Sequence, residues 1–244
     1  AKGEALFDRI AGCADSGILV LIGDIDEKSL KKALVTYAVD FKTLGRRPSR
    51  PVSSYQPLSG TVELYRKGKE NSVDIVLSAP VLLTGESYYT AEITALCLRR
   101  ALSQIVTGRG MHVRVRHNCN LHPHERVSIM LSLREASVDG FATGTSHHEP
   151  EEALVEVREL LRNLESVELT DAELASYKAL IKQKIKREQN NPGFWYEVLA
   201  MRYVEGKDYY SSFESKIDAI TKEDIMDMLG LLSKGSRVEY LIER

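Results

Sequence analysis

Cysteine is scarce in this sequence. Cys13, Cys97 and Cys119 are widely spaced, and no Cys-x-x-Cys pair occurs. A disulfide framework and a thiolate zinc site both need more cysteines at closer spacing, so the sequence argues against both. One disulfide beside a free thiol stays open. Cys97 lies in an apolar helical pattern, which favours a small core residue.

Long apolar runs are also missing. The longest is the five residues Ile18–Ile22, whereas a membrane-spanning helix needs about 20. We therefore expect a soluble chain with no membrane span. It opens on Ala1-Lys2-Gly3-Glu4, without an initiator Met or a signal-peptide pattern, which indicates a processed protein or a piece of a longer one. The compartment is left open, since a periplasmic and a cytoplasmic location fit equally.

An excess of charge of either sign is absent as well. The net charge is −2 and the pI is near 6.4, so no overall field attracts nucleic acid or an anionic membrane. With 43% hydrophobic and 28% charged residues in 244, the composition is typical of a globular chain with a sizeable core. We expect partners to be recognised at local sites and no nucleic acid among them.

The N-terminal part combines a short apolar run with an amphipathic helix. Gly17–Ile22 is rich in β-branched residues and leucine, which predicts a strand buried on both faces. Asp26 is suited to cap a helix from Glu27 to about Asp40, because apolar residues recur there at three- and four-residue spacing. The proline- and arginine-rich stretch 44–57 is expected to be a loop.

Two pairs of alternating segments predict β-hairpins. Residues 60–66 and 72–78 form the first pair, and residues 111–116 and 127–134 form the second, in which one face is polar. A broad apolar stripe predicts a largely buried helix over 86–106 between the pairs.

The C-terminal part is expected to be helical. Helices are predicted to open at Pro150-Glu151, at a Thr170-x-x-Glu173 capping box, near Phe194 and at a Thr221-x-x-Asp224 capping box. A last strand is predicted over 238–242. The sequence thus predicts an α+β fold, with a mixed or antiparallel sheet covered on one face by helices. We expect one domain over 1–244, with a sheet region over 1–150 and a helical region over 151–244 that has a closing strand.

Several motifs, in this order and spacing, resemble the insulinase-like (pitrilysin or mitochondrial processing peptidase) zinc peptidases. They are the Leu19-Val20-Leu21-Ile22-Gly23-Asp24-Ile25-Asp26 junction, the helix over 91–106 leading to a strand, Leu169-Thr170-Asp171-Ala172-Glu173-Leu174, and Ile220-Thr221-Lys222-Glu223-Asp224-Ile225. The resemblance implies the second of the two α/β pieces in a half-unit of that family, of the non-catalytic C-terminal type.

The zinc motif of that family, His-x-x-Glu-His, occurs nowhere in the chain. His122-x-x-Glu125 is followed by Arg126 where the second histidine belongs, and guanidinium is not a zinc ligand. Pro123 and the flanking strand patterns favour a solvated hairpin loop. His147 and His148 precede a helix start, where adventitious metal binding is conceivable. We expect no catalytic residue, metal ligand or cofactor in this chain, and zinc in a catalytic half.

One substrate-binding candidate follows from the resemblance. The non-metal half of catalytic pairs in the family usually carries an arginine and a tyrosine at the turn after its long helix. This chain has no tyrosine there and a displaced arginine, Arg109. We do not carry the family's roles over to this turn. Arg109 is kept as the candidate substrate-binding residue, although the displaced position favours an ordinary surface arginine.

The basic residues His112, Arg114 and Arg116 form a second candidate. With Arg99, Arg100 and Arg109 nearby in sequence, they suit an anionic-ligand patch, with Tyr88 and Tyr89 among the aromatics that could accompany it. A solvated, charged strand face is the default explanation of the same residues.

The leading hypothesis is a domain without zinc ligands that helps a catalytic peptidase half, in the same protein or in a partner chain, to bind or enclose a peptide substrate. A non-enzymatic scaffold or assembly module with the same fold is the alternative. A third reading is a zinc metalloendopeptidase whose metal ligands lie upstream of Ala1.

Overall fold

The computed structural model describes residues 18–37, 56, 58–68, 72–107, 109, 111–135 and 149–243. The chain groups into two compact units, one drawn from Ala1–Ser54 and Arg187–Gly206, the other from Tyr55–Lys186 and Lys207–Arg244. The expectation of a single domain over 1–244 stays a prediction.

The first unit contributes two described helices. α2 spans Glu27–Tyr37, and Asp26 caps it as expected, because its Oδ2 accepts a 2.8 Å hydrogen bond from the Ser29 N–H. α6 spans Pro192–Tyr203, with Asn191 as its N-cap and Pro192 at the start, where a missing N–H costs nothing.

The prediction of a buried strand at Gly17–Ile22 is wrong for the described residues of that run. Ile18–Ile22 has no strand assignment, and Ile18, Leu19 and Leu21 are 50%, 68% and 45% exposed. An apolar run becomes a strand only where a second strand pairs with its backbone, and sequence periodicity does not supply that partner. The predicted loop over 44–57 lies almost wholly outside the described residues.

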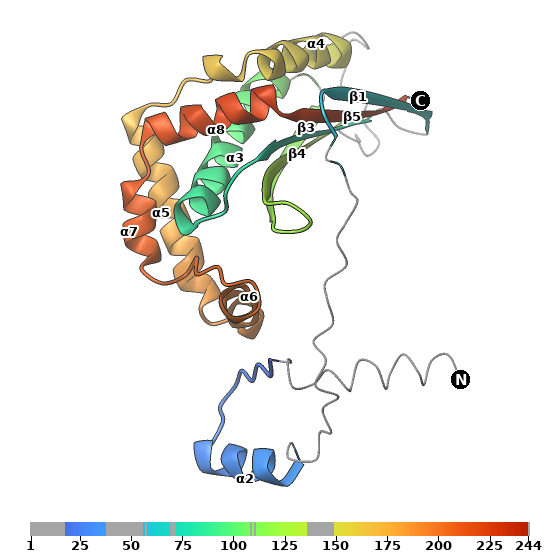
Figure 1. The fold of residues 1–244 in the computed structure, drawn as a ribbon. Helices are drawn as coiled ribbons and strands as arrows, with labels where there is room; N and C mark the ends of the chain where they lie inside the picture. Colours follow the sequence, from blue (N-terminus) through green and yellow to red (C-terminus); the bar gives the residue numbers. More distant parts are fainter. Residues whose placement is uncertain are drawn as a thin grey trace, which may run out of the picture. The chain divides into compact units, whose positions relative to one another are not determined.

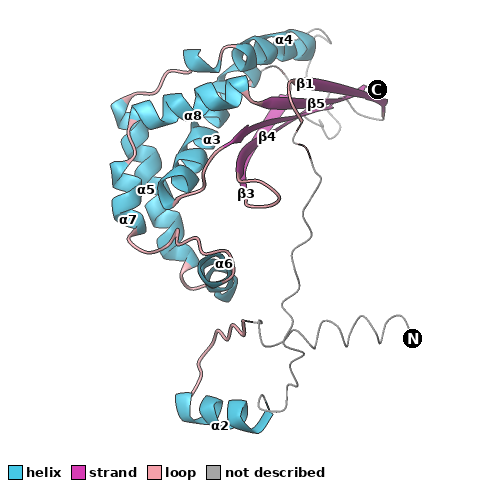
Figure 2. Ribbon diagram, viewed as in Figure 1, coloured by secondary structure: helices cyan, strands magenta, loops and turns pink. Residues whose placement is uncertain are grey.

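The second unit is built on a five-stranded sheet in the order β1-β5-β2-β4-β3 (Figures 1 and 2). The strands are β1 Thr61–Lys67, β2 Ser72–Pro80, β3 Met111–Asn120, β4 Arg126–Glu135 and β5 Ser236–Glu243. β1 and β5 are parallel, and the other neighbours are antiparallel. The sheet is therefore mixed, as the fold class predicted.

The predicted hairpin between β1 and β2 is wrong, although both strands form. β5 lies between them and pairs with both, so Val238 is opposite Val62 on one side and Val76 on the other. Alternation in sequence marks two strands but not their partners, and the C-terminal strand competes for the same edges. The second predicted hairpin, β3 and β4, is confirmed.

Helices cover one face of this sheet (Figure 2). The described helices of the second unit are α3 Gly85–Val106, α4 Glu149–Arg162, α5 Asp171–Glu188, α7 Phe213–Ala219 and α8 Lys222–Lys234, with a 3₁₀ turn at Leu164–Ser166. α3 packs along β3 and β4, and α8 packs on β2. The sequence did not predict α7, which is only two turns long.

Strand alternation places the core between the sheet and these helices. The fully buried strand residues are Val73, Ile75, Leu77, Ala79, Val127, Ile129, Leu131 and Leu133, and α3 adds Ile93, Cys97, Leu98 and Leu102. Cys97 is a core residue, as predicted, and it and Cys119 are free thiols. Burial raises the pKa of the Cys97 thiol to about 12, so it stays protonated and unreactive at neutral pH.

Both predicted capping boxes are confirmed. Thr170 and Glu173 exchange hydrogen bonds at the start of α5, and Thr221 and Asp224 do so at the start of α8. Each box satisfies backbone N–H groups that have no partner inside the helix.

A buried carboxylate ties α4 to β5. Glu239 is 3% exposed and its Oε1 accepts hydrogen bonds from Arg158 Nε at 2.8 Å and Nη2 at 2.6 Å. Its Oε2 accepts a third from Arg237 Nη2 at 2.9 Å. Two guanidinium groups thus balance one buried negative charge on the helix-covered face.

No helix among the described residues is long and apolar enough to cross a membrane.

Candidate functional site

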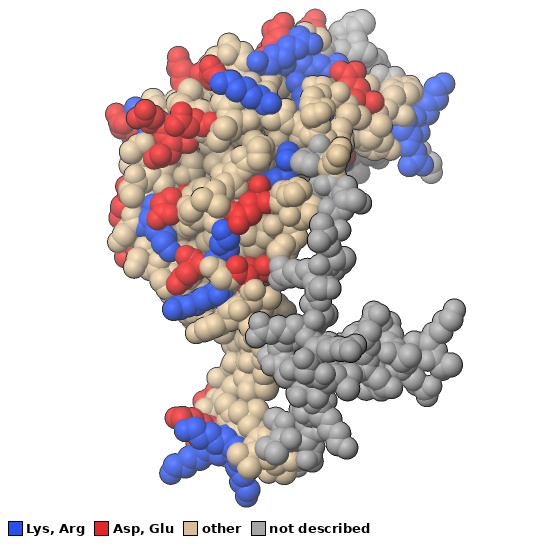
Figure 3. Space-filling model, viewed as in Figure 1, with Lys and Arg blue, Asp and Glu red and all other residues tan. Residues whose placement is uncertain are grey.

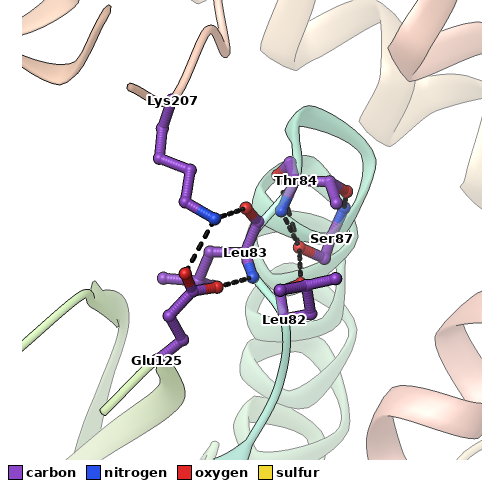
Figure 4. Close-up of polar contacts among 6 residues, drawn as sticks. All are labelled: Leu82, Leu83, Thr84, Ser87, Glu125 and Lys207. Carbon is purple, nitrogen blue, oxygen red and sulfur yellow. Dashed lines mark hydrogen bonds and ion pairs between the residues drawn. The ribbon is translucent and has the colours of Figure 1, made fainter. Parts of the chain in front are cut away.

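The hairpin loop between β3 and β4 carries the His122-x-x-Glu125 segment. Glu125 does not point into solvent. Its Oε2 accepts a 2.6 Å hydrogen bond from the Leu83 N–H, just before α3, and its Oε1 pairs with Lys207 Nζ at 2.8 Å (Figure 4). Lys207 Nζ also donates to the Leu83 carbonyl at 2.9 Å. Glu125, Leu83 and Lys207 form a closed triangle, which we call the Glu125 clasp.

The clasp lies against the capped start of α3. Thr84 is the N-cap, and its N–H donates to Ser87 Oγ at 2.8 Å while its Oγ1 accepts from the Ser87 N–H at 3.2 Å. The clasp therefore joins the β3–β4 loop, the α3 N-terminus and the segment before α7. This geometry gives Glu125 a structural role.

Electrostatics favour the charged form of Glu125. The hydrogen bond from Lys207 and the one from the Leu83 N–H hold the pKa of this carboxyl below its ordinary value of 4.5. A general base in a zinc peptidase instead needs a carboxylate that is free to take up a proton. Glu125 is engaged on both oxygens.

The histidines of the same segment do not form a metal centre with Glu125. His122 and His124 are exposed, and they lie in a loop, whereas the zinc motif needs them on one face of a helix. In the part of the chain that the structure describes, no three His, Cys, Asp or Glu side chains are grouped so that they could hold a metal ion. The predicted hairpin loop is confirmed. His147 and His148 lie outside the described residues.

Arg109, the predicted substrate-binding residue, lies at the turn between α3 and β3. Its Nη1 pairs with Glu156 Oε1 of α4 at 2.6 Å, and both side chains are about one-third to one-half exposed. A ligand carboxylate would have to compete with Glu156 for this guanidinium. Its role in substrate binding stays a prediction.

The sheet face opposite the helices, which we call the open face, carries a basic half and an apolar half. In the basic half, β3 contributes the exposed His112, Arg114 and Arg116, and β4 contributes Arg126 and Arg134. In the apolar half, the strand register places Val62, Leu64, Val76, Val238 and Ile242 on the same face. Arg66 of β1 is exposed at its far end.

Few carboxylates balance these arginines. Among the paired strand residues the register places one acid, Asp74, on the open face. It binds Arg134 Nη2 through both oxygens, at 2.9 and 2.8 Å. Over the helical side, by contrast, Figure 3 shows Lys and Arg side chains interspersed with Asp and Glu.

Arg126 is held in place by neutral groups. Its Nε donates to Ser78 Oγ at 3.0 Å, and its Nη2 donates to Ser236 Oγ at 3.1 Å and to the Ser78 carbonyl at 3.3 Å. Ser128 Oγ donates to Ser78 Oγ at 2.9 Å. Serine oxygens orient this guanidinium without neutralising it, so it presents a fixed positive charge at the end of the face.

The predicted anionic-ligand patch needs correction. Arg99 and Arg100 are on α3, on the covered side of the sheet, and Arg100 Nη1 pairs with Glu173 at 2.8 Å. The patch therefore keeps His112, Arg114 and Arg116 but gains Arg126 and Arg134 in place of the α3 arginines. The alternation of Ser128, Met130, Ser132 and Arg134 in sequence was the signal that could have added β4.

Tyr88 and Tyr89 also lie on the covered side. The Tyr88 ring stacks on Tyr209 at 4.7 Å between centroids and meets His117 edge-on at 5.8 Å. The Tyr89 hydroxyl donates to the Tyr209 carbonyl at 3.1 Å, and burial raises its pKa. These rings stabilise packing between α3, β3 and the segment before α7 and do not reach the basic half.

β3 is an edge strand. It pairs with β4 along its full length, and among the described residues no strand lies on its other side. An edge strand offers a row of backbone N–H and C=O groups to an added strand. The basic side chains of β3 would then lie directly beside alternate side chains of that strand.

No protein-family model and no curated protein matches this sequence. Solved structures do match it. A mutant of the ferredoxin protease FusC in complex with Arabidopsis ferredoxin is 18% identical with a TM-score of 0.66, over 91% of this chain and 24% of that one. A predicted insulinase family protease from Yersinia pestis is 12% identical with a TM-score of 0.61, over 91% and 50%.

A third structure is a peptidase M16 inactive domain from Pseudomonas fluorescens, 14% identical with a TM-score of 0.55, over 89% of this chain and 52% of that one. The chain thus spans about a quarter to a half of the structures it matches. At these identities the likeness shows the fold, and the fold is the one that the sequence motifs indicated.

Proposed function

We propose that this chain, which has the fold of one piece of an insulinase-like peptidase half-unit, is a non-catalytic domain. It assists the binding or enclosure of a peptide substrate by a catalytic half, in the same protein or in a partner chain. The observation that carries the proposal is the peptidase fold combined with a sequence in which His-x-x-Glu-His does not occur.

The Glu125 clasp supports the non-catalytic part. The His122-x-x-Glu125 segment has Arg126 where the zinc motif needs a histidine, and Glu125 is bound to Lys207 and to the Leu83 N–H. Zinc-dependent hydrolysis needs a glutamate beside a metal-bound water. Here the same residue type fastens a loop to a helix start.

The β3 edge supports the peptide-binding part. An extended peptide that adds to a sheet edge gains backbone hydrogen bonds that do not depend on its sequence. β3 is ten residues long, which is enough for a peptide of similar length to pair with it. Arg109 stays a second candidate contact, where a substrate carboxylate would displace Glu156.

The test measures cleavage and binding on the purified full chain. We expect no chelator-sensitive cleavage of a mixed peptide library, and binding of extended peptides with slowed amide exchange in β3. The opposite edge strand, β1, should exchange as before and serves as the internal control. Robust chelator-sensitive cleavage would contradict the non-catalytic assignment, and failure to bind any peptide would favour a scaffold module.

A further inference from the structure

The charge pattern of the open face narrows the peptides that this chain selects. We infer that the β3 edge and the basic half of the open face bind acidic extended segments, with Asp or Glu at every second position and apolar residues between them. This inference rests on the proposed function, because it names the substrate class of the same edge.

The spacing of the basic residues on β3 determines the spacing of acidic residues in the peptide that would bind beside it. His112, Arg114 and Arg116 alternate with Val113 and Val115, so all three project from the open face. A strand added beside β3 presents its own side chains to that face with the same period of two. Its alternate residues therefore lie next to Arg114 and Arg116, at the separation of a cross-strand pair.

The charges of the β3 arginines are not neutralised within the described part of the sheet. Arg114 and Arg116 are exposed, and among the described residues neither forms an ion pair. Their cross-strand neighbours on β4 are Ser132 and Met130, which are uncharged. Acidic side chains of an added strand would therefore meet arginines that no carboxylate of the described residues pairs with.

Arginines of β4, the strand that pairs with β3, add to the preference for acidic side chains. Arg126 is oriented by Ser78 and Ser236, and its charge is not countered by a carboxylate among the described residues. Arg134 is already paired with Asp74, so it contributes less. The chain as a whole has a net charge of −2, which means that this positive surface is a local feature and not a reflection of composition.

Polypeptide is favoured over nucleic acid as the occupant. The basic residues lie beside Met130, 47% exposed, and the wider face continues into the aliphatic side chains of β1 and β5. Sequence-tolerant binding of single strands relies on aromatic rings interleaved with basic residues. Tyr88 and Tyr89 lie on the covered side, and Tyr240, which the register places on the open face, is on β5 and separated from the β4 and β3 arginines by β2. An apolar and basic face suits a peptide with acidic and aliphatic residues.

The experiment compares matched peptides on the full chain. Three fluorescein-labelled nine-residue probes are titrated by anisotropy: glutamate alternating with valine, lysine alternating with valine, and the first composition with its glutamates contiguous. We expect the alternating glutamate peptide to bind about threefold to tenfold more tightly than the other two, from two cross-strand charge pairs. The advantage should shrink as salt is added.

Reversing the charge of the β3 arginines tests the inference most directly, through the order of the peptide affinities. In Arg114→Glu/Arg116→Glu the order of the two alternating peptides should invert, so that the lysine peptide binds better. Arg99→Glu is the matched control, because Arg99 is an exposed arginine of α3 on the covered side; it should leave the order unchanged. Circular dichroism of both variants confirms that the fold is kept, since all three side chains are on the surface.

The outcomes separate this inference from the proposed function. If the alternating peptides bind equally well and slow exchange in β3, the acidic preference is wrong while peptide binding stands. If no probe binds, the proposed function itself fails for this chain. If a single-stranded RNA of equal charge displaces the glutamate peptide and itself depends on Arg114 and Arg116, the surface is a general polyanion site and the inference is overturned.

Discussion

At the scale of one residue, Glu125 belongs to a segment that resembles a catalytic motif, but its contacts stabilise the packing of a loop against a helix start. The sequence placed it in a hairpin loop, and that placement is confirmed. Its partners could not be predicted, because Lys207 and Leu83 are distant in sequence and meet Glu125 only once α3 and the sheet have packed. Local patterns identify loops well, but long-range ion pairs follow from the tertiary fold.

Replacing Glu125 with glutamine should lower stability in a pH-dependent way. Glutamine cannot pair with the Lys207 charge, so we expect the free energy of unfolding to fall by about 1 to 2 kcal/mol at neutral pH. The folded pKa of Glu125 is lowered from 4.5, so its contribution is complete above that value. The contribution is lost as the pH falls through the folded pKa.

Urea unfolding of both proteins at about pH 7 and about pH 3.5 measures this difference. The gap between wild type and Glu125→Gln should narrow at the lower pH. Glu159→Gln is the control, because Glu159 is an exposed glutamate of α4, and it should change stability little at either pH. An equal gap at both pH values would show that the charge of Glu125 does not stabilise the clasp.

At the scale of secondary-structure elements, the start of β5 depends on close backbone approach. Gly235 lies between α8 and β5, and a Cβ atom there would meet the Ser78 carbonyl of β2 and lie 3.2 Å from the Leu231 carbonyl. Both obstacles are backbone. The glycine therefore lets β5 enter between β1 and β2 directly after a helix.

Gly235→Ala should destabilise the protein by about 1 to 3 kcal/mol, since the strand must shift to relieve the contact. Gly230→Ala is a matched control inside α8, where the new Cβ meets only Glu165 Oε1 at 3.6 Å. That change should stabilise by about 0.5 to 1 kcal/mol, because alanine favours a helix. Thermal unfolding of both variants checks the signs, and a neutral Gly235→Ala would refute the close-approach argument.

Individual helices and strands were easier to predict from the sequence than the order in which the strands pair. The capping boxes at Thr170 and Thr221 and the alternation of β3 and β4 are local signals, and each gave the right element. β5 was also expected as a strand, but its position between β1 and β2 was not, because any strand with a matching face can compete for an edge. Ile18–Ile22 failed for the same reason, since its apolar pattern carries no information about a partner strand.

At the scale of the whole molecule, the α+β class and the peptidase fold could be predicted from the order of soft motifs. The candidate site was predicted only in part. His112, Arg114 and Arg116 were identified from alternation, whereas Arg126 and Arg134 joined them only through the β3–β4 register. A surface that several strands build is determined by their alignment, and alignment depends on packing that one sequence does not display.

The central proposal is that this chain, which has the fold of a zinc peptidase piece, does not itself form a catalytic zinc centre. The most direct test is the zinc content of the full chain, purified without a metal-binding tag and measured by elemental analysis. The account predicts less than about a tenth of an equivalent of zinc. About one tightly bound equivalent would contradict it, and would make His122, His124, Glu125, His147 and His148 the first residues to test as ligands.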